Sequence, residues 1–61
     1  MPRIVVLAKP GRTEEQRSTL ARKVTDAVVE SFDVEPSTVT IIFADMHDEL
    51  VAEGGVLKSA L

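Results

Sequence analysis

Pro2 is the residue of this chain whose type and position are best suited to chemistry. It follows Met1 directly and begins the segment PRIVVLA, which reads as a strand, although proline has no backbone N–H to donate to a sheet. Because Pro2 is small, removal of Met1 is expected, and this would leave a free secondary amine. A free α-amino group titrates at about 7.7 to 8.0 in peptides, and an apolar pocket or a nearby cation would lower the pKa of the prolyl amine toward neutrality. Such an amine is a suitable general base.

Arg12 is the second candidate, because of where it stands relative to a predicted helix. Thr13 and Gln16 have the spacing of a capping box, and Glu14 and Glu15 fall in the first turn. A cation just before the helix is opposed by the positive end of the helix dipole, so the helix gains nothing from Arg12. An arginine fork beside free N–H groups suits a carboxylate ligand. The alternative is an ordinary loop arginine in solvent.

The elements that must position these residues form a β-α-β unit. A strand is predicted over residues 3–8, because residues 4–8 are aliphatic and end at the turn Lys9-Pro10-Gly11. A helix of about 19 residues is predicted after Thr13, ending before Pro36. A second strand is predicted over residues 38–44, parallel to the first with a right-handed crossover. Gly54-Gly55 predicts a short C-terminal hairpin. The expected fold class is α/β (or α+β), in a single domain over residues 1–61.

The predicted helix has two different sides. Its apolar residues follow the spacing of one buried stripe, and its charged residues are predicted to form a solvated face. The stripe consists of Leu20, Ala21, Val24, Ala27, Val28 and Phe32, and the charged face of Arg17, Arg22, Lys23, Asp26 and Glu30.

Composition excludes several classes of function. The net charge of −3 and the pI near 4.9 argue against a nucleic-acid partner. The longest apolar run, Ile4 to Ala8, is far short of the roughly 20 residues that cross a bilayer, and no signal peptide is evident, so we expect no membrane partner and a cytoplasmic protein. There is no cysteine and His47 is the only histidine, so we expect neither disulfide, metal nor other cofactor.

Size and patterning predict self-association. A chain of 61 residues is small for an independent core and has no disulfide or zinc site to help it. The second strand has apolar side chains on both faces, as in a sheet covered on both sides, and one helix can cover only one of them. The other face and the open edges are therefore expected to meet another subunit.

The sequence resembles the 4-oxalocrotonate tautomerase family, the small members of the tautomerase superfamily. The resemblance rests on Met-Pro at the start with Gly11-Arg12-Thr13 and Glu15-Gln16 at this spacing, together with the helix pattern and Gly54-Gly55. It implies a tautomerase (MIF-like) β-α-β protomer, usually in a hexamer, and an isomerase activity. Pro2 would shift a proton in an enol or dienol acid, such as a 2-hydroxymuconate-like or arylpyruvate-like substrate, and Arg12 of an adjacent subunit would hold its carboxylate.

The sequence departs from that family at several expected substrate-binding positions. Family enzymes that act on diacids have a second arginine at the position of Thr40 and an aromatic residue at the position of Val51. Thr38, close to Thr40 in the sequence, is a further candidate for substrate binding. A hydroxyl offers one donor and no charge, so the usual diacid fits poorly. Arg3 and Lys9 replace residues that are often apolar. We hypothesise that one of them supplies the displaced positive charge and lowers the pKa of Pro2; ordinary surface charge is the alternative.

Other functions stay open on the sequence alone. The chain could be one subunit of a mixed oligomer whose partner supplies the missing arginine. It could hydrate or dehalogenate an unsaturated acid, with a protonated Pro2 acting as an acid. It could also be a non-catalytic oligomeric module in which Pro2 only begins a strand, since a retained Met1 would make the proline nitrogen a tertiary amide.

Overall fold

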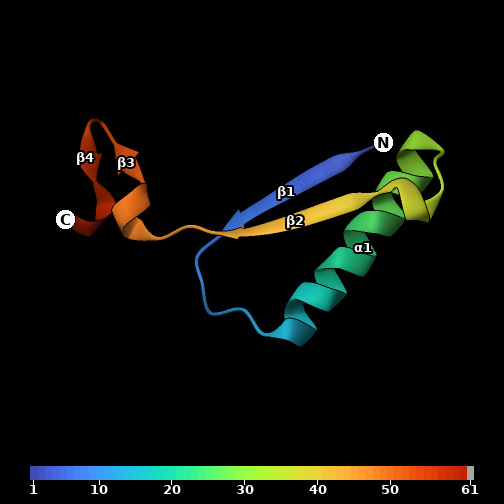
Figure 1. Cartoon of the computed structure of the whole chain (residues 1–61), viewed down its shortest axis with the longest axis horizontal. Helices are drawn as coiled ribbons and strands as arrows, with labels where there is room; N and C mark the ends of the chain where they lie inside the picture. The colour runs from blue at the N-terminus through green and yellow to red at the C-terminus, as the bar shows by residue number, and fades with distance from the viewer. Residues whose placement is uncertain (61) are drawn as a thin grey trace.

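The computed structural model describes residues 1–60 and has the β-α-β order that the sequence predicts (Figure 1). Strand β1 (Arg3–Ala8) is followed by helix α1 (Glu14–Phe32) and strand β2 (Thr40–Asp45). A hairpin of β3 (Ala52–Glu53) and β4 (Val56–Leu57) follows β2. Three short 3-10 helices complete the described elements: η1 (Pro36–Thr38) before β2, η2 (Asp48–Leu50) before the hairpin and η3 (Lys58–Ala60) after it. β1 and β2 pair in parallel, and β3 and β4 pair antiparallel across Gly54-Gly55. The predicted α/β fold class is confirmed.

The beginning and end of α1 both follow local chemistry. The Thr13 N–H donates to Gln16 Oε1 at 2.9 Å and the Gln16 N–H donates to Thr13 Oγ1 at 3.1 Å, so both bonds of the predicted capping box are present. At the other end, Asp33 adopts a left-handed conformation with φ of 55° and donates its N–H to the Val29 carbonyl. The helix therefore ends at Phe32, before the restriction that Pro36 imposes.

Strand β2 begins at Thr40, later than the predicted start at residue 38. Thr38 belongs instead to η1, where its N–H and its hydroxyl both donate to the Glu35 carbonyl, at 3.0 and 2.7 Å. The Val39 N–H likewise donates to Pro36, at 3.1 Å. The Thr38 N–H is therefore committed to a local turn and does not extend the ladder with β1.

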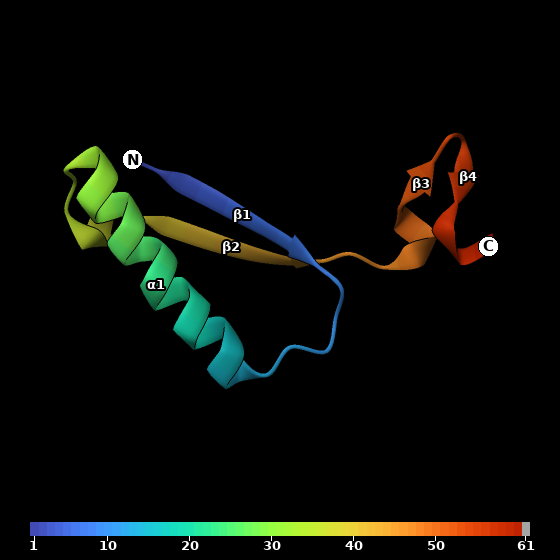
Figure 2. The same ribbon diagram turned by 180° about the vertical axis from the view of Figure 1, so that it is seen from behind.

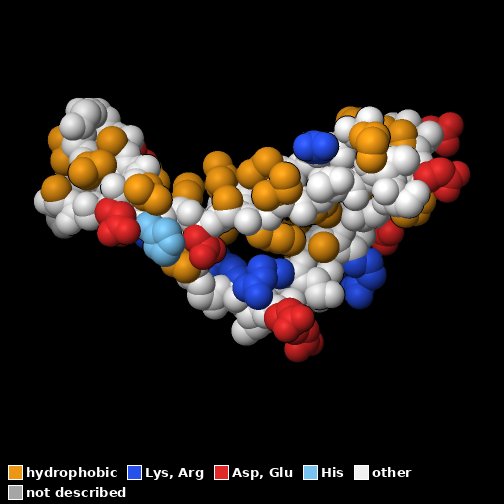
Figure 3. All heavy atoms as spheres, in the orientation of Figure 1, with side chains coloured by type: hydrophobic (Ala, Val, Ile, Leu, Met, Phe, Trp, Pro, Cys, Tyr) orange, Lys and Arg blue, Asp and Glu red, His pale blue; other side chains and the backbone are white. Residues whose placement is uncertain are grey.

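The two faces of the β1-β2 sheet differ in exposure. Side chains alternate along a strand, and Ile4, Val6 and Ala8 are half-buried on the side of α1. The opposite face stays open: Val5 is 56% exposed, Leu7 60% and Ile42 44%. Hydrophobic side chains accordingly form a band along the strands in Figure 3. Phe32, predicted to lie on the buried stripe of the helix, is 66% exposed.

The isolated chain has no interior. None of the described residues, 1–60, is classed as buried, and the radius of gyration is 14.9 Å, whereas a compact domain of this length has about 10.5 Å. The hairpin lies apart from the β-α-β unit, at the far end of the molecule from the amino terminus (Figures 1 and 2). Within residues 1–60, no helix has the length and apolar character needed to traverse a bilayer.

Candidate active site

The predicted site residues fall at the two ends of β1 and in the C-terminal tail. Pro2, Arg3, Thr38 and Thr40 lie where the parallel strands begin. Lys9 and Arg12 lie beyond the point where β1 ends. The six residues of β1 span roughly 20 Å at about 3.3 Å per residue. One copy of the chain therefore does not bring Pro2 and Arg12 together.

Pro2 is held to the sheet by its oxygen and not by its nitrogen. Its carbonyl accepts the Thr40 N–H at 3.0 Å, and its half-buried ring precedes the first residue of β1. The nitrogen has no hydrogen to give to the ladder, so pairing with β2 leaves it uncommitted. Met1 is 88% exposed, which leaves the bond between Met1 and Pro2 accessible at the surface.

Arg3 and Thr40 are direct partners across the sheet. They are the first pair in the register of β1 and β2, and both are exposed. Partners in a parallel pair project to the same face, so the Arg3 side chain leaves the sheet beside that of Thr40. Thr38 is directed locally, because its hydroxyl donates to the Glu35 carbonyl at 2.7 Å.

The amino end of α1 diverges from the sheet (Figure 2). A hollow of about 210 Å³ is lined there by residues of β1, β2 and the first turns of α1. It combines an apolar wall with three cations and one carboxylate. Figure 3 shows Lys and Arg side chains gathered between the strands and the first turns of α1. The residues that line the hollow are Val6, Ala8, Lys9, Arg12, Gln16, Arg17, Leu20, Phe43, Ala44 and Asp45. An organic anion with an apolar part matches this lining.

Arg12 stands on a segment fixed to the first turn of α1. Besides the capping box, the Arg17 backbone N–H donates to the Thr13 carbonyl at 3.0 Å, and Arg17 Nη1 donates to the Arg12 carbonyl at 2.6 Å. The helical pattern predicts that Arg17 lies on the solvated face of the helix, and it does not predict this contact. The only signal for the contact in the sequence is the position of Arg17 five residues after Arg12.

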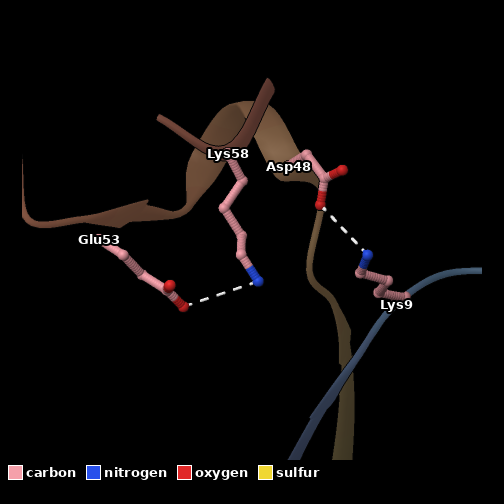
Figure 4. Close-up of polar contacts among 4 residues, drawn as sticks. All are labelled: Lys9, Asp48, Glu53 and Lys58. Atoms are coloured by element: carbon pink, nitrogen blue, oxygen red, sulfur yellow. Dashed lines mark ion pairs between the residues drawn. The ribbon is translucent and has the colours of Figure 1, made fainter. Parts of the chain in front are cut away.

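Lys9 and Val51 have partners of their own. Lys9 Nζ lies 3.6 Å from Asp48 Oδ1, which joins the end of β1 to η2 (Figure 4). Both side chains are largely exposed, so this ion pair contributes little stability. Val51 lies in the tail, half-buried, and its carbonyl accepts the Lys58 N–H at 2.8 Å. Lys58 Nζ in turn lies 3.6 Å from Glu53 Oε1 (Figure 4).

The described residues offer no built metal centre. Within residues 1–60 no group of three or more His, Cys, Asp or Glu side chains converges. His47 and the neighbouring Asp45 and Asp48 are all exposed.

Comparison with known proteins identifies the family. The sequence model of the Tautomerase family, described as "Tautomerase enzyme", matches residues 2–61. A probable tautomerase of Bacillus cereus is 38% identical over 55 residues, which cover 90% of each chain. A probable tautomerase of Lactiplantibacillus plantarum is 34% identical over 59 residues, 97% of this chain and 92% of that protein. The chain belongs to the Tautomerase family.

Solved structures agree with this assignment. YwhB, a homologue of 4-oxalocrotonate tautomerase, superposes with a TM-score of 0.85 at 30% identity and 98% coverage of both chains. A heterohexamer 4-oxalocrotonate tautomerase from Chloroflexus aurantiacus gives a TM-score of 0.79 at 28% identity, with 100% of this chain and 98% of that chain covered. The small β-α-β tautomerase fold is therefore shared by the chain and these proteins.

Proposed function

We propose that this protein is a keto-enol tautomerase in which Pro2, exposed by removal of Met1, is the general base. The ring nitrogen takes a proton from the hydroxyl of an enol or dienol carboxylic acid, and a proton is delivered to carbon to give the isomeric ketone. No cofactor is needed for this transfer, because one basic nitrogen suffices to accept and return the proton.

The position of the proline nitrogen is the observation that carries the proposal. Pro2 is anchored through its carbonyl oxygen to the Thr40 N–H at 3.0 Å, while its nitrogen takes no part in the sheet. The backbone pairing of β1 with β2 thus holds a potential base at a defined position. Membership of the Tautomerase family supports the proposed reaction.

The complete site is proposed to form between copies of the chain. Pro2 precedes β1, whereas Arg12 lies in the loop beyond the far end of this strand, which is roughly 20 Å long, so the arginine that meets a given Pro2 is proposed to come from another copy. The open sheet face, with Leu7 60% exposed, supplies an apolar surface for such an assembly. A hexamer is the proposed state, and the heterohexameric relative supports an oligomer of this size.

The proposed substrate is a carboxylated enol with an apolar part. Arg12 would bind its carboxylate through a bidentate contact, and the apolar wall of the hollow, which includes Leu20 and Phe43, would take the remainder. Thr40 and Val51 offer no second charge, so a single carboxylate fits better than two. Arg3, beside Thr40, is the proposed source of any second cationic contact.

Intact-mass measurement combined with an activity assay tests the proposal. Protein without Met1 should convert phenylenolpyruvate to its keto form, which is measured as the loss of enol absorbance. Protein that retains Met1 should be inactive. Pro2→Ala keeps a processed amino terminus but lacks the secondary amine, and we expect its kcat to fall about 100-fold or more. Equal activity of the forms with and without Met1 would remove Pro2 from the mechanism.

A mixed oligomer is the second candidate, favoured by Thr40 and by the heterohexameric relative from Chloroflexus aurantiacus. In that case a related partner chain would supply the cation that Thr40 lacks. Purification from the native cells under mild conditions should then yield a second small chain in constant ratio. Full activity of the purified single chain would exclude this arrangement.

A further inference from the structure

Arg17 holds two consecutive carbonyl oxygens just before α1. Its backbone N–H donates to Thr13 O at 3.0 Å, and its guanidinium Nη1 donates to Arg12 O at 2.6 Å. Arg17 also lines the same hollow as Arg12. A hydrogen bond from a charged donor is stronger than a neutral one, so the contact to Arg12 is the firmer of the two.

The segment on the other side of Arg12 has little to hold it. Within residues 1–60, no backbone hydrogen bond outside regular strands and helices involves residues 9–11. Gly11 has φ of 113°, a conformation that favours glycine. The peptide that follows Arg12 is thus fixed from α1 alone, by the capping box and by Arg17.

We propose that Arg17 is a positioning residue, which fixes the Arg12 peptide so that the Arg12 guanidinium is presented to the substrate carboxylate. This inference rests on the proposed function, in which Arg12 binds that carboxylate. Arg17 acts through Arg12 because one of its terminal nitrogens is already committed to the Arg12 carbonyl. The substrate contact itself belongs to Arg12.

Arg22 provides a matched control on the same helix. It is also an exposed arginine of α1, but within residues 1–60 it takes part in no ion pair or side-chain hydrogen bond. Arg17→Met and Arg22→Met remove the same charge from the same helix. Only the former removes the contact to Arg12.

The decisive test is a double-mutant cycle between Arg17→Met and Arg12→Ala. Interactions made equally in the ground and transition states change KM and leave kcat unaltered, so we expect Arg17→Met to raise KM about tenfold with kcat within about twofold. Arg17→Lys, which keeps a charged donor, should recover most of this loss. In the Arg12→Ala background, Arg17→Met should have no further effect on KM, because the carbonyl of residue 12 is still present but the guanidinium that Arg17 positions is already gone. Arg22→Met should match the wild type.

The outcomes separate the inference from the function on which it rests. Additive effects of Arg12→Ala and Arg17→Met, or equal behaviour of Arg17→Met and Arg22→Met, overturn the positioning role. Calorimetric titration with 3-phenylpropanoate, a non-reacting carboxylate, repeats the cycle without catalysis. If the wild type binds this acid but does not tautomerise any enol, the proposed function fails while the same coupling in Kd still supports Arg17. Absence of both binding and turnover overturns both proposals.

Discussion

Arg3 lies directly across from Thr40 at the beginning of the parallel sheet, and both side chains are exposed on the same face. Within residues 1–60 no ion pair or side-chain hydrogen bond involves Arg3. The unpaired cation of Arg3 therefore lies on the strand next to Thr40, whose side chain carries no charge. Arg3 also directly follows the proposed base, Pro2.

Replacement of Arg3 tests whether this cation serves the substrate. We expect Arg3→Ala to raise KM about tenfold, because loss of a charge-assisted contact costs about 1.5 kcal/mol or more. Lys9→Ala should have a smaller effect, since Lys9 already pairs with Asp48. Steady-state kinetics on both variants, with Arg22→Ala as the control, provide the measurement. Unchanged kinetics in both would show that Arg3 and Lys9 are ordinary surface charges.

The pH profile distinguishes a base from an acid at Pro2. A general base must be unprotonated, so kcat/KM should rise with pH as the prolyl amine loses its proton and then level off. The hydratase or dehalogenase alternative requires the protonated amine, and its rate would fall over the same range. Removal of the Arg3 cation should move the rising limb toward higher pH, because a nearby positive charge disfavours the ammonium form.

The open face of the sheet is predicted to be an interface. Leu7→Glu places a carboxylate on that face, where Leu7 is 60% exposed in a single copy. The substitution should cause the oligomer to dissociate into smaller species. Each copy loses the free energy of burying a leucine side chain, about 1.5–3 kcal/mol, and gains an unpaired charge at the interface. Light scattering coupled to size exclusion gives the mass. Lys23→Glu, on the exposed side of α1, should leave that mass unchanged.

The capping box is predicted to stabilise the beginning of α1. Thr13→Ala removes the acceptor of the Gln16 N–H and should lower the free energy of unfolding by about 1 kcal/mol. Ser18→Ala changes an exposed residue within the same helix and should cause no such loss. Urea denaturation at one fixed protein concentration compares the two variants. Equal midpoints would show that the cap does not limit stability.

The sequence was sufficient for those parts of the fold that depend on neighbouring residues. The capping box of Thr13 and Gln16 uses contacts three residues apart, and the turn at Gly54-Gly55 uses conformations that glycine favours, with φ of 61° and 82°. The parallel arrangement follows from the length of the connecting helix. Thr38 was wrongly assigned to a strand because its bonds to Glu35 form a competing local turn.

The site was less predictable because it depends on where long side chains end. Periodicity identifies the side of the helix from which Arg17 departs, but the side chain is long enough to return to the Arg12 carbonyl. Phe32 fits the apolar stripe by spacing but is 66% exposed at the end of the helix. The meeting of Pro2 with an arginine depends on another copy, and no local pattern specifies how copies pack.

The lack of any buried side chain within residues 1–60 has a consequence for how the protein behaves in dilute solution. If association provides the interior, the melting temperature should climb as more protein is added, since binding stabilises only the folded form. Specific activity should decline when the enzyme is diluted far enough for copies to separate, and concentrating the sample should restore it.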